Sequence, residues 1–116
     1  MSFPAALLVT LAVEVPLYVA ALVALRITRP GRAALLGVAV NLVTHPLLWW
    51  SLAPRPAPGR IAAAEVLVWA AETGLLWLGL LWLGLRGRSS LPVLAVVSAG
   101  ANAASILAGV LFSAAA

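Results

Sequence analysis

The sequence has no cysteine and no lysine, and charged residues make up only 9% of its 116 positions. The absence of cysteine excludes disulfides, thiolate metal sites and thiol nucleophiles. The scarcity of charge separates the chain from soluble domains, in which about 25% of residues are charged. Because 65% of the residues are hydrophobic, a water-soluble protein of this length could not bury them all. The composition therefore predicts a single integral membrane domain over residues 1–116, with the lipid bilayer as its solvent.

Four apolar runs are long enough to cross a bilayer, at residues 3–25, 33–52, 61–85 and 91–112. A hydrocarbon core about 30 Å thick needs about 20 helical residues at a rise of about 1.5 Å each. Short connections with proline or glycine favour antiparallel neighbours. The predicted fold is all-α, an antiparallel bundle of four transmembrane helices. The first run has a glutamate at its centre and no basic residue before it, so we expect a span and not a cleaved signal peptide.

All seven basic residues are arginines, and they lie in the connections between the apolar runs. Five are in loops 26–32 and 86–90, and two are in loop 53–60. The positive-inside rule then predicts that loops 26–32 and 86–90 are cytoplasmic and that both termini are outside, with dual topology as an alternative. The arginines form no continuous basic face, so nucleic acid is not an expected partner. Arginine without lysine, together with abundant alanine, leucine, glycine and proline, suggests a bacterial inner-membrane protein.

Polar side chains inside the four runs are the informative residues. All three acidic residues and the only histidine lie there. On insertion scales a charged residue at the centre of a helix costs about 2.5–3.5 kcal/mol, whereas each leucine returns about 0.3–0.6 kcal/mol. Such groups usually face a bundle interior or a water-filled cavity and are functional candidates. The candidate ligand-binding or ion-binding residues are Glu14, Asn41, His45, Glu65, Glu72 and Asn102.

Helical spacing places these residues on one polar edge of each helix. Thr10, Glu14 and Tyr18 share a face of the first run, and Asn41 lies one turn before His45 in the second. The third run pairs Glu65 with Glu72 on one face, and the fourth aligns Ser98, Asn102 and Ser105. Prolines 16 and 46 lie close to ionisable groups and are expected to kink their helices. Four polar edges in one bundle should meet in the same layer.

The two halves of the sequence resemble each other. Glu14 is followed by an arginine-containing turn and by Asn41-Leu-Val-Thr44, and Glu72 is followed by another such turn and by Asn102-Ala-Ala-Ser105. The glutamate and the asparagine are 27 residues apart in the first half and 30 in the second. Two pseudo-repeated hairpins of this kind would be related by an axis along the membrane normal. His45 and Glu65 have no counterparts, so the predicted site is asymmetric.

Three functions compete on this evidence. The first is a small transporter or ion-conducting protein, in which buried carboxyl and imidazole groups bind protons or a cation. The second is an intramembrane metalloprotein or enzyme with a divalent metal ion on Glu14, His45 and Glu72. No compact ligand or catalytic motif supports an enzyme. The third is a non-catalytic subunit of a larger membrane complex, whose polar groups hold helices together by hydrogen bonds.

In size and number of spans the chain resembles the small multidrug resistance exporters, which also carry one glutamate in the first of four helices. The matching residue here is Glu14, in Ala12-Val-Glu-Val15. The resemblance implies transport by a homo-oligomer, a dimer or larger, and a partner membrane protein is the alternative to self-association. The other three runs lack that family's aromatic and glycine patterns, and two further glutamates and a histidine depart from a single-carboxylate mechanism.

Overall fold

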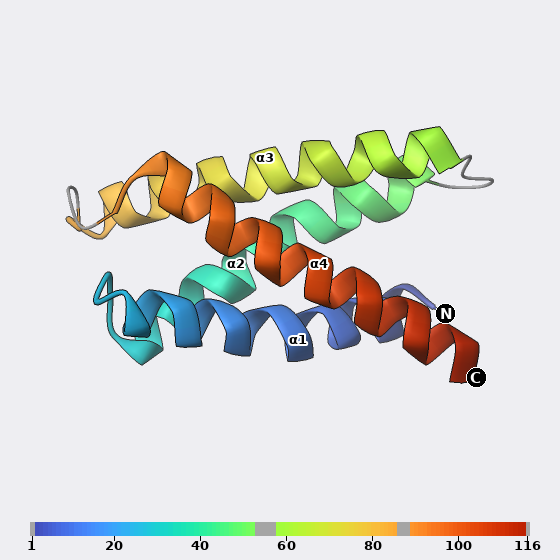
Figure 1. Ribbon diagram of the computed structural model, residues 1–116, viewed down its shortest axis with the longest axis horizontal. Helices are drawn as coiled ribbons and strands as arrows, with labels where there is room; N and C mark the ends of the chain where they lie inside the picture. Colours follow the sequence, from blue (N-terminus) through green and yellow to red (C-terminus); the bar gives the residue numbers. More distant parts are fainter. Residues whose placement is uncertain (1, 53–57, 86–88, 116) are drawn as a thin grey trace.

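The computed structural model describes residues 2–52, 58–85 and 89–115 and consists of four long helices (Figure 1). Each helix is long and apolar enough to cross a membrane, with mean hydropathy between 1.4 and 2.2. The predicted all-α fold is confirmed, and the chain is compatible with a small membrane protein. The helices are α1 (Phe3–Ala24), α2 (Pro30–Leu52), α3 (Pro58–Trp82) and α4 (Leu91–Ala115).

The helix boundaries differ from the predicted spans by a few residues. Helices α2 and α3 both begin at a proline, Pro30 and Pro58, three residues before the predicted apolar runs. Proline fits the first turn of a helix because its missing N–H has no partner there. Helix α3 ends at Trp82 and not at Leu85, because Gly84 adopts φ 74° and cannot continue the helix. Prolines 16 and 46 lie inside helices that continue past them.

The helices pack in a closed ring, in which α1 and α3 each contact both α2 and α4. The start of α1 and the end of α4 lie at one end of the bundle, which we call the termini end (Figure 1). The end of α2 and the start of α3 lie at the same end. The opposite end, where α1 turns into α2, is called the hairpin end. This arrangement makes successive helices antiparallel, as predicted.

Buried apolar side chains fill the half of the bundle nearer the hairpin end. Tyr18 and Leu22 of α1 and Leu76 of α3 are fully buried there. Leucines on the outer surface are exposed, including Leu8 at 66% and Leu67 at 69%. An apolar exterior with a sealed interior is the expected form of a bundle whose solvent is hydrocarbon. The remaining core residues are Ile27, Ala33, Leu36, Val40, Leu80, Leu94 and Ala101.

Candidate functional site: a polar cavity within the bundle

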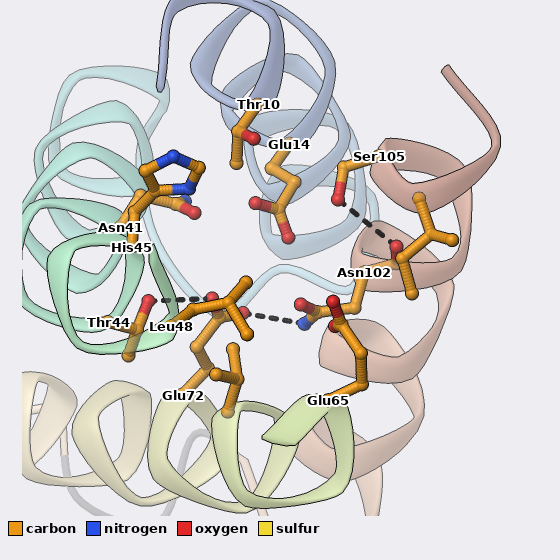
Figure 2. Close-up of a pocket in the computed structure, with 12 residues that line it drawn as sticks. Thr10, Glu14, Asn41, Thr44, His45, Leu48, Glu65, Glu72, Asn102 and Ser105 are labelled. Carbon is orange, nitrogen blue, oxygen red and sulfur yellow. Dashed lines mark hydrogen bonds between the residues drawn. The ribbon is translucent and has the colours of Figure 1, made fainter. Parts of the chain in front are cut away.

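The polar edges of the four helices meet in one cavity of about 100 Å³ (Figure 2). The cavity begins where the apolar core stops and lies in the middle of the bundle and toward its termini end. By volume it has room for several water molecules or for one small ligand. Its lining residues are Thr10, Glu14, Asn41, Thr44, His45, Leu48, Glu65, Val68, Glu72, Asn102, Ser105 and Ile106.

All six residues that the sequence singled out line this cavity, although they come from four different helices. Glu14, Asn41 and Glu72 are each only 1% exposed, and His45 and Asn102 are each 8% exposed. Glu65 is half-buried at the side of the cavity nearer the termini end. The structure therefore brings the polar groups of separate helices together, as the sequence predicted.

Glu72 is held by hydrogen bonds from all three other helices (Figure 2). Tyr18 of α1 donates its hydroxyl to Oε2 at 2.8 Å, and Asn102 of α4 donates Nδ2 to the same oxygen at 2.6 Å. Thr44 of α2 lies with Oγ1 2.9 Å from Oε1. Both oxygens of this carboxyl group are therefore hydrogen-bonded to side chains of neighbouring helices. Glu72 is thus the polar anchor at the centre of the bundle.

The residues that bond to Glu72 have further hydrogen-bond partners, Asn102 and Thr44 within their own helices and Tyr18 on α4. Asn102 also donates Nδ2 to the carbonyl of Ser98, one turn earlier, at 2.9 Å. The Thr44 hydroxyl lies 3.0 Å from the carbonyl of Val40, likewise one turn earlier. The Tyr18 hydroxyl is within 3.4 Å of Ser98 Oγ. These further bonds fix the orientation of the side chains around Glu72.

Glu14 and His45 differ from Glu72 because each has a buried polar atom with no hydrogen-bond partner among the described residues. These atoms are Glu14 Oε1 and His45 Nε2. Figure 2 shows the Glu14 carboxyl group pointing into the space between the α2 and α4 side chains. An unpaired buried polar group costs about 1–3 kcal/mol, and an unpaired charge costs more. Native structures usually explain such atoms by a water, an ion or a ligand.

Aromatic rings cover His45 on the side toward the termini end. The ring of Phe3 lies 5.5 Å from that of His45 and 5.7 Å from that of Trp49, measured between centroids. Tilted and edge-on contacts at these distances are favourable for aromatic pairs. Phe3 therefore covers the imidazole on the side toward the termini end, whereas Glu65 provides a polar edge to the same cavity.

The metal hypothesis for Glu14, His45 and Glu72 finds no support in this geometry. Within residues 2–52, 58–85 and 89–115, no three histidine, cysteine or acidic side chains are placed to hold a metal ion. The physical reason lies at Glu72, whose oxygens already accept hydrogen bonds from side chains of three helices. Turning this carboxyl group toward a metal would break those three hydrogen bonds.

Of the residues that hydrogen-bond to Glu72, sequence reasoning included Asn102 in the site but not Tyr18 or Thr44, and it also left out Ser98, which bonds to Tyr18 and Asn102. Tyr18, Thr44 and Ser98 belong to the polar edges that helical spacing identified, and their hydroxyl groups are buried. The signal that could have found them is the one-turn spacing from Glu14 to Tyr18 and from Ser98 to Asn102. That spacing does not reveal which carboxylate each donor reaches.

The cavity has the chemistry of a cation site or a proton site. It presents three carboxyl groups and an imidazole, and none of its described lining residues is arginine or lysine. Negative and acceptor groups in a space of low dielectric favour positive ligands and exclude anions. Comparison with protein-family models, with curated proteins and with solved structures found no match to this chain.

Proposed function

We propose that this chain is a small polytopic membrane protein that binds a proton or a small cation in the cavity and carries it across the bilayer. The observation that carries the proposal is the pair of buried, unpaired atoms on one cavity, Glu14 Oε1 and His45 Nε2. Both atoms come from membrane-spanning stretches, where an unsatisfied polar group is expensive. A proton or a cation is the ligand that removes this cost.

The division of the bundle into two parts supports a carrier. Toward the hairpin end the apolar core closes the interior, and Leu22 and Leu76 there are fully buried. Toward the termini end the cavity contains Glu65, which is half-buried. A site that is polar on one side and sealed by side-chain packing on the other is the arrangement that alternating access requires.

The proposal includes residence in a bacterial inner membrane, with the hairpin end in the cytoplasm. Arg26, Arg29 and Arg32 lie at or just after the turn between α1 and α2, where the positive-inside rule favours the cytoplasmic side. Three further arginines on which the predicted orientation depends, Arg55, Arg86 and Arg88, lie outside the described residues. Because the bundle has only four helices, the proposal also includes action as a homo-oligomer or with another membrane protein.

The test is proton flux into liposomes that contain the purified protein and a pH-sensitive dye. We expect a membrane potential to drive acidification in the wild type, and Glu14→Gln to reduce it to the level of protein-free liposomes. Glutamine keeps the size of the side chain and removes its exchangeable proton. If protons alone do not move, the same liposomes are tested with a radiolabelled small cation.

Leu8→Ala provides the matched control, because Leu8 lies on the same helix and is 66% exposed on the outer surface. This variant should retain wild-type flux. Equal flux in wild type and Glu14→Gln would contradict the carrier role of Glu14. Absence of both proton and cation flux from the wild-type protein would contradict transport as a whole and leave the subunit hypothesis.

A further inference from the structure

The helices of the second hairpin repeat those of the first at constant offsets along the sequence. Helices α1 and α3 end 58 positions apart, and α2 and α4 begin 61 positions apart. Glu14 and Glu72 are related by the first offset, and Asn41 and Asn102 by the second. A duplication with three extra residues in the second turn accounts for both offsets.

Backbone and side-chain details repeat at the same offsets. Arg26 and Gly84, which follow the ends of α1 and α3, both have positive φ angles, 56° and 74°. In each hairpin the next amide bonds to the carbonyl five residues earlier at 2.9 Å, which is the Schellman pattern of a helix end. Asn41 and Asn102 each donate to the carbonyl four residues earlier, also at 2.9 Å. Equivalent positions therefore have equivalent structure as well as similar sequence.

The duplication makes Glu14 and Glu72 equivalent positions with unequal surroundings. Glu72 accepts a hydrogen bond from Tyr18, whereas the position equivalent to Tyr18 in the second hairpin is Leu76, which has no polar atom. Glu14 therefore lacks the aromatic hydroxyl donor that Glu72 has, and its Oε1 is unpaired. In its place the cavity contains His45, whose equivalent in α4 is Ile106.

We infer that the two glutamates have different roles. The hydrogen bonds of Glu72 are all made within the protein, whereas Glu14, together with His45, binds one small protonated amine. The inference rests on the proposed function, since it names the class of cation that the cavity takes. An ammonium group supplies the two things that Glu14 lacks, a positive charge and N–H donors. Its N–H groups match a pair of acceptors, the Glu14 carboxylate and His45 Nε2 in the tautomer protonated on Nδ1.

Size and ligand type favour an amine over a metal ion or a large cation. The cavity of about 100 Å³ has room for a methylammonium-sized ligand. Among the residues that the structure describes, no three side chains of metal-ligating type are placed for a metal ion. The hydroxyl oxygens of Thr10 and Ser105 at the cavity wall are further acceptors for N–H groups.

The experiment is calorimetric titration of the purified protein in detergent with methylammonium chloride. Sodium chloride and tetramethylammonium chloride are titrated in parallel. Neither cation has an N–H group. Sodium tests for binding of charge alone, and tetramethylammonium tests for binding of an organic cation. We expect one methylammonium per chain, at least about tenfold weaker binding of tetramethylammonium, and no saturable binding of sodium. Sodium or tetramethylammonium binding as tightly as methylammonium would overturn the amine assignment.

Two matched variants test the division of roles between the carboxyl groups. Glu14→Gln should lose methylammonium binding, whereas Glu72→Gln should retain one site, because the glutamine oxygen still accepts from its donors. His45→Ala should bind at least about tenfold more weakly. Loss of binding in Glu72→Gln but not in Glu14→Gln would overturn the inference. Proton flux in liposomes without methylammonium binding would contradict the amine alone, and binding without any flux would contradict the carrier alone.

Discussion

Glu14 and Glu72 are the same residue type at equivalent positions of two hairpins, and each is only 1% exposed, yet their surroundings are opposite. Three side chains from three helices form hydrogen bonds with Glu72. Glu14 has a buried oxygen that nothing reaches. One carboxyl group is therefore part of what holds the bundle together, and the other is available to a ligand. Burial alone does not distinguish these roles, because only the donors around each group do.

The largest expected difference between the two sites is in stability. Glu72→Leu removes the side-chain hydrogen bonds that join α3 to the other three helices, so we expect the free energy of unfolding to fall by about 2–4 kcal/mol. Glu14→Leu removes a buried carboxyl group that has an unpaired oxygen, so it should raise the free energy of unfolding by about 1–3 kcal/mol. Reversible unfolding in mixed detergent micelles, followed by circular dichroism, measures both. Equal losses would show that Glu14 is also a structural anchor.

A smaller difference is expected between the hydroxyl groups at the equivalent positions Thr44 and Ser105. Thr44 reaches Glu72 Oε1 at 2.9 Å, whereas Ser105 donates to the carbonyl of Asn102 within its own helix at 3.1 Å. Thr44→Val should lower the free energy of unfolding by about 1 kcal/mol, and Ser105→Ala by less than about 0.5 kcal/mol. The same micelle unfolding assay compares them, and a larger loss for Ser105→Ala would reverse the proposed asymmetry.

The smallest expected effect concerns the helix ends and applies to the duplication itself. Arg26 has φ 56° at the position where the second hairpin has Gly84. A left-handed conformation is strained for a residue with a Cβ and free for glycine. Arg26→Gly should therefore raise the free energy of unfolding by about 0.5 kcal/mol, and Gly84→Ala should lower it by about 1 kcal/mol. If Arg26→Gly destabilises the protein, the arginine side chain contributes more than its backbone costs.

Much of the architecture could be predicted, because lipid solvent imposes simple rules. The length of each apolar run and the short connections led to four antiparallel helices, and every helix appears within a few residues of its predicted place. The errors lie at the ends. Pro30 and Pro58 were assigned to connections, although proline fits the first turn of a helix.

The polar residues of the site could also be predicted, but their pairing could not. Any carboxyl, imidazole or amide group in a membrane-spanning run must turn toward the interior. Helical spacing showed which residues share an edge, such as Asn41 and His45. It did not show that Tyr18 of α1 would cross the bundle to Glu72 of α3, because that contact depends on the rotation of each helix and the order of the ring.

The sequence by itself determined that the chain has four apolar helices with polar groups inside. Hydrophobicity and helical period are local properties, so they can be read from the order of the residues. Only the tertiary structure decided which carboxyl group has hydrogen-bond partners on both oxygens and which has a buried oxygen without one. That choice depends on distances between side chains of different helices, and a shift of about 1 Å is enough to make or remove a hydrogen bond.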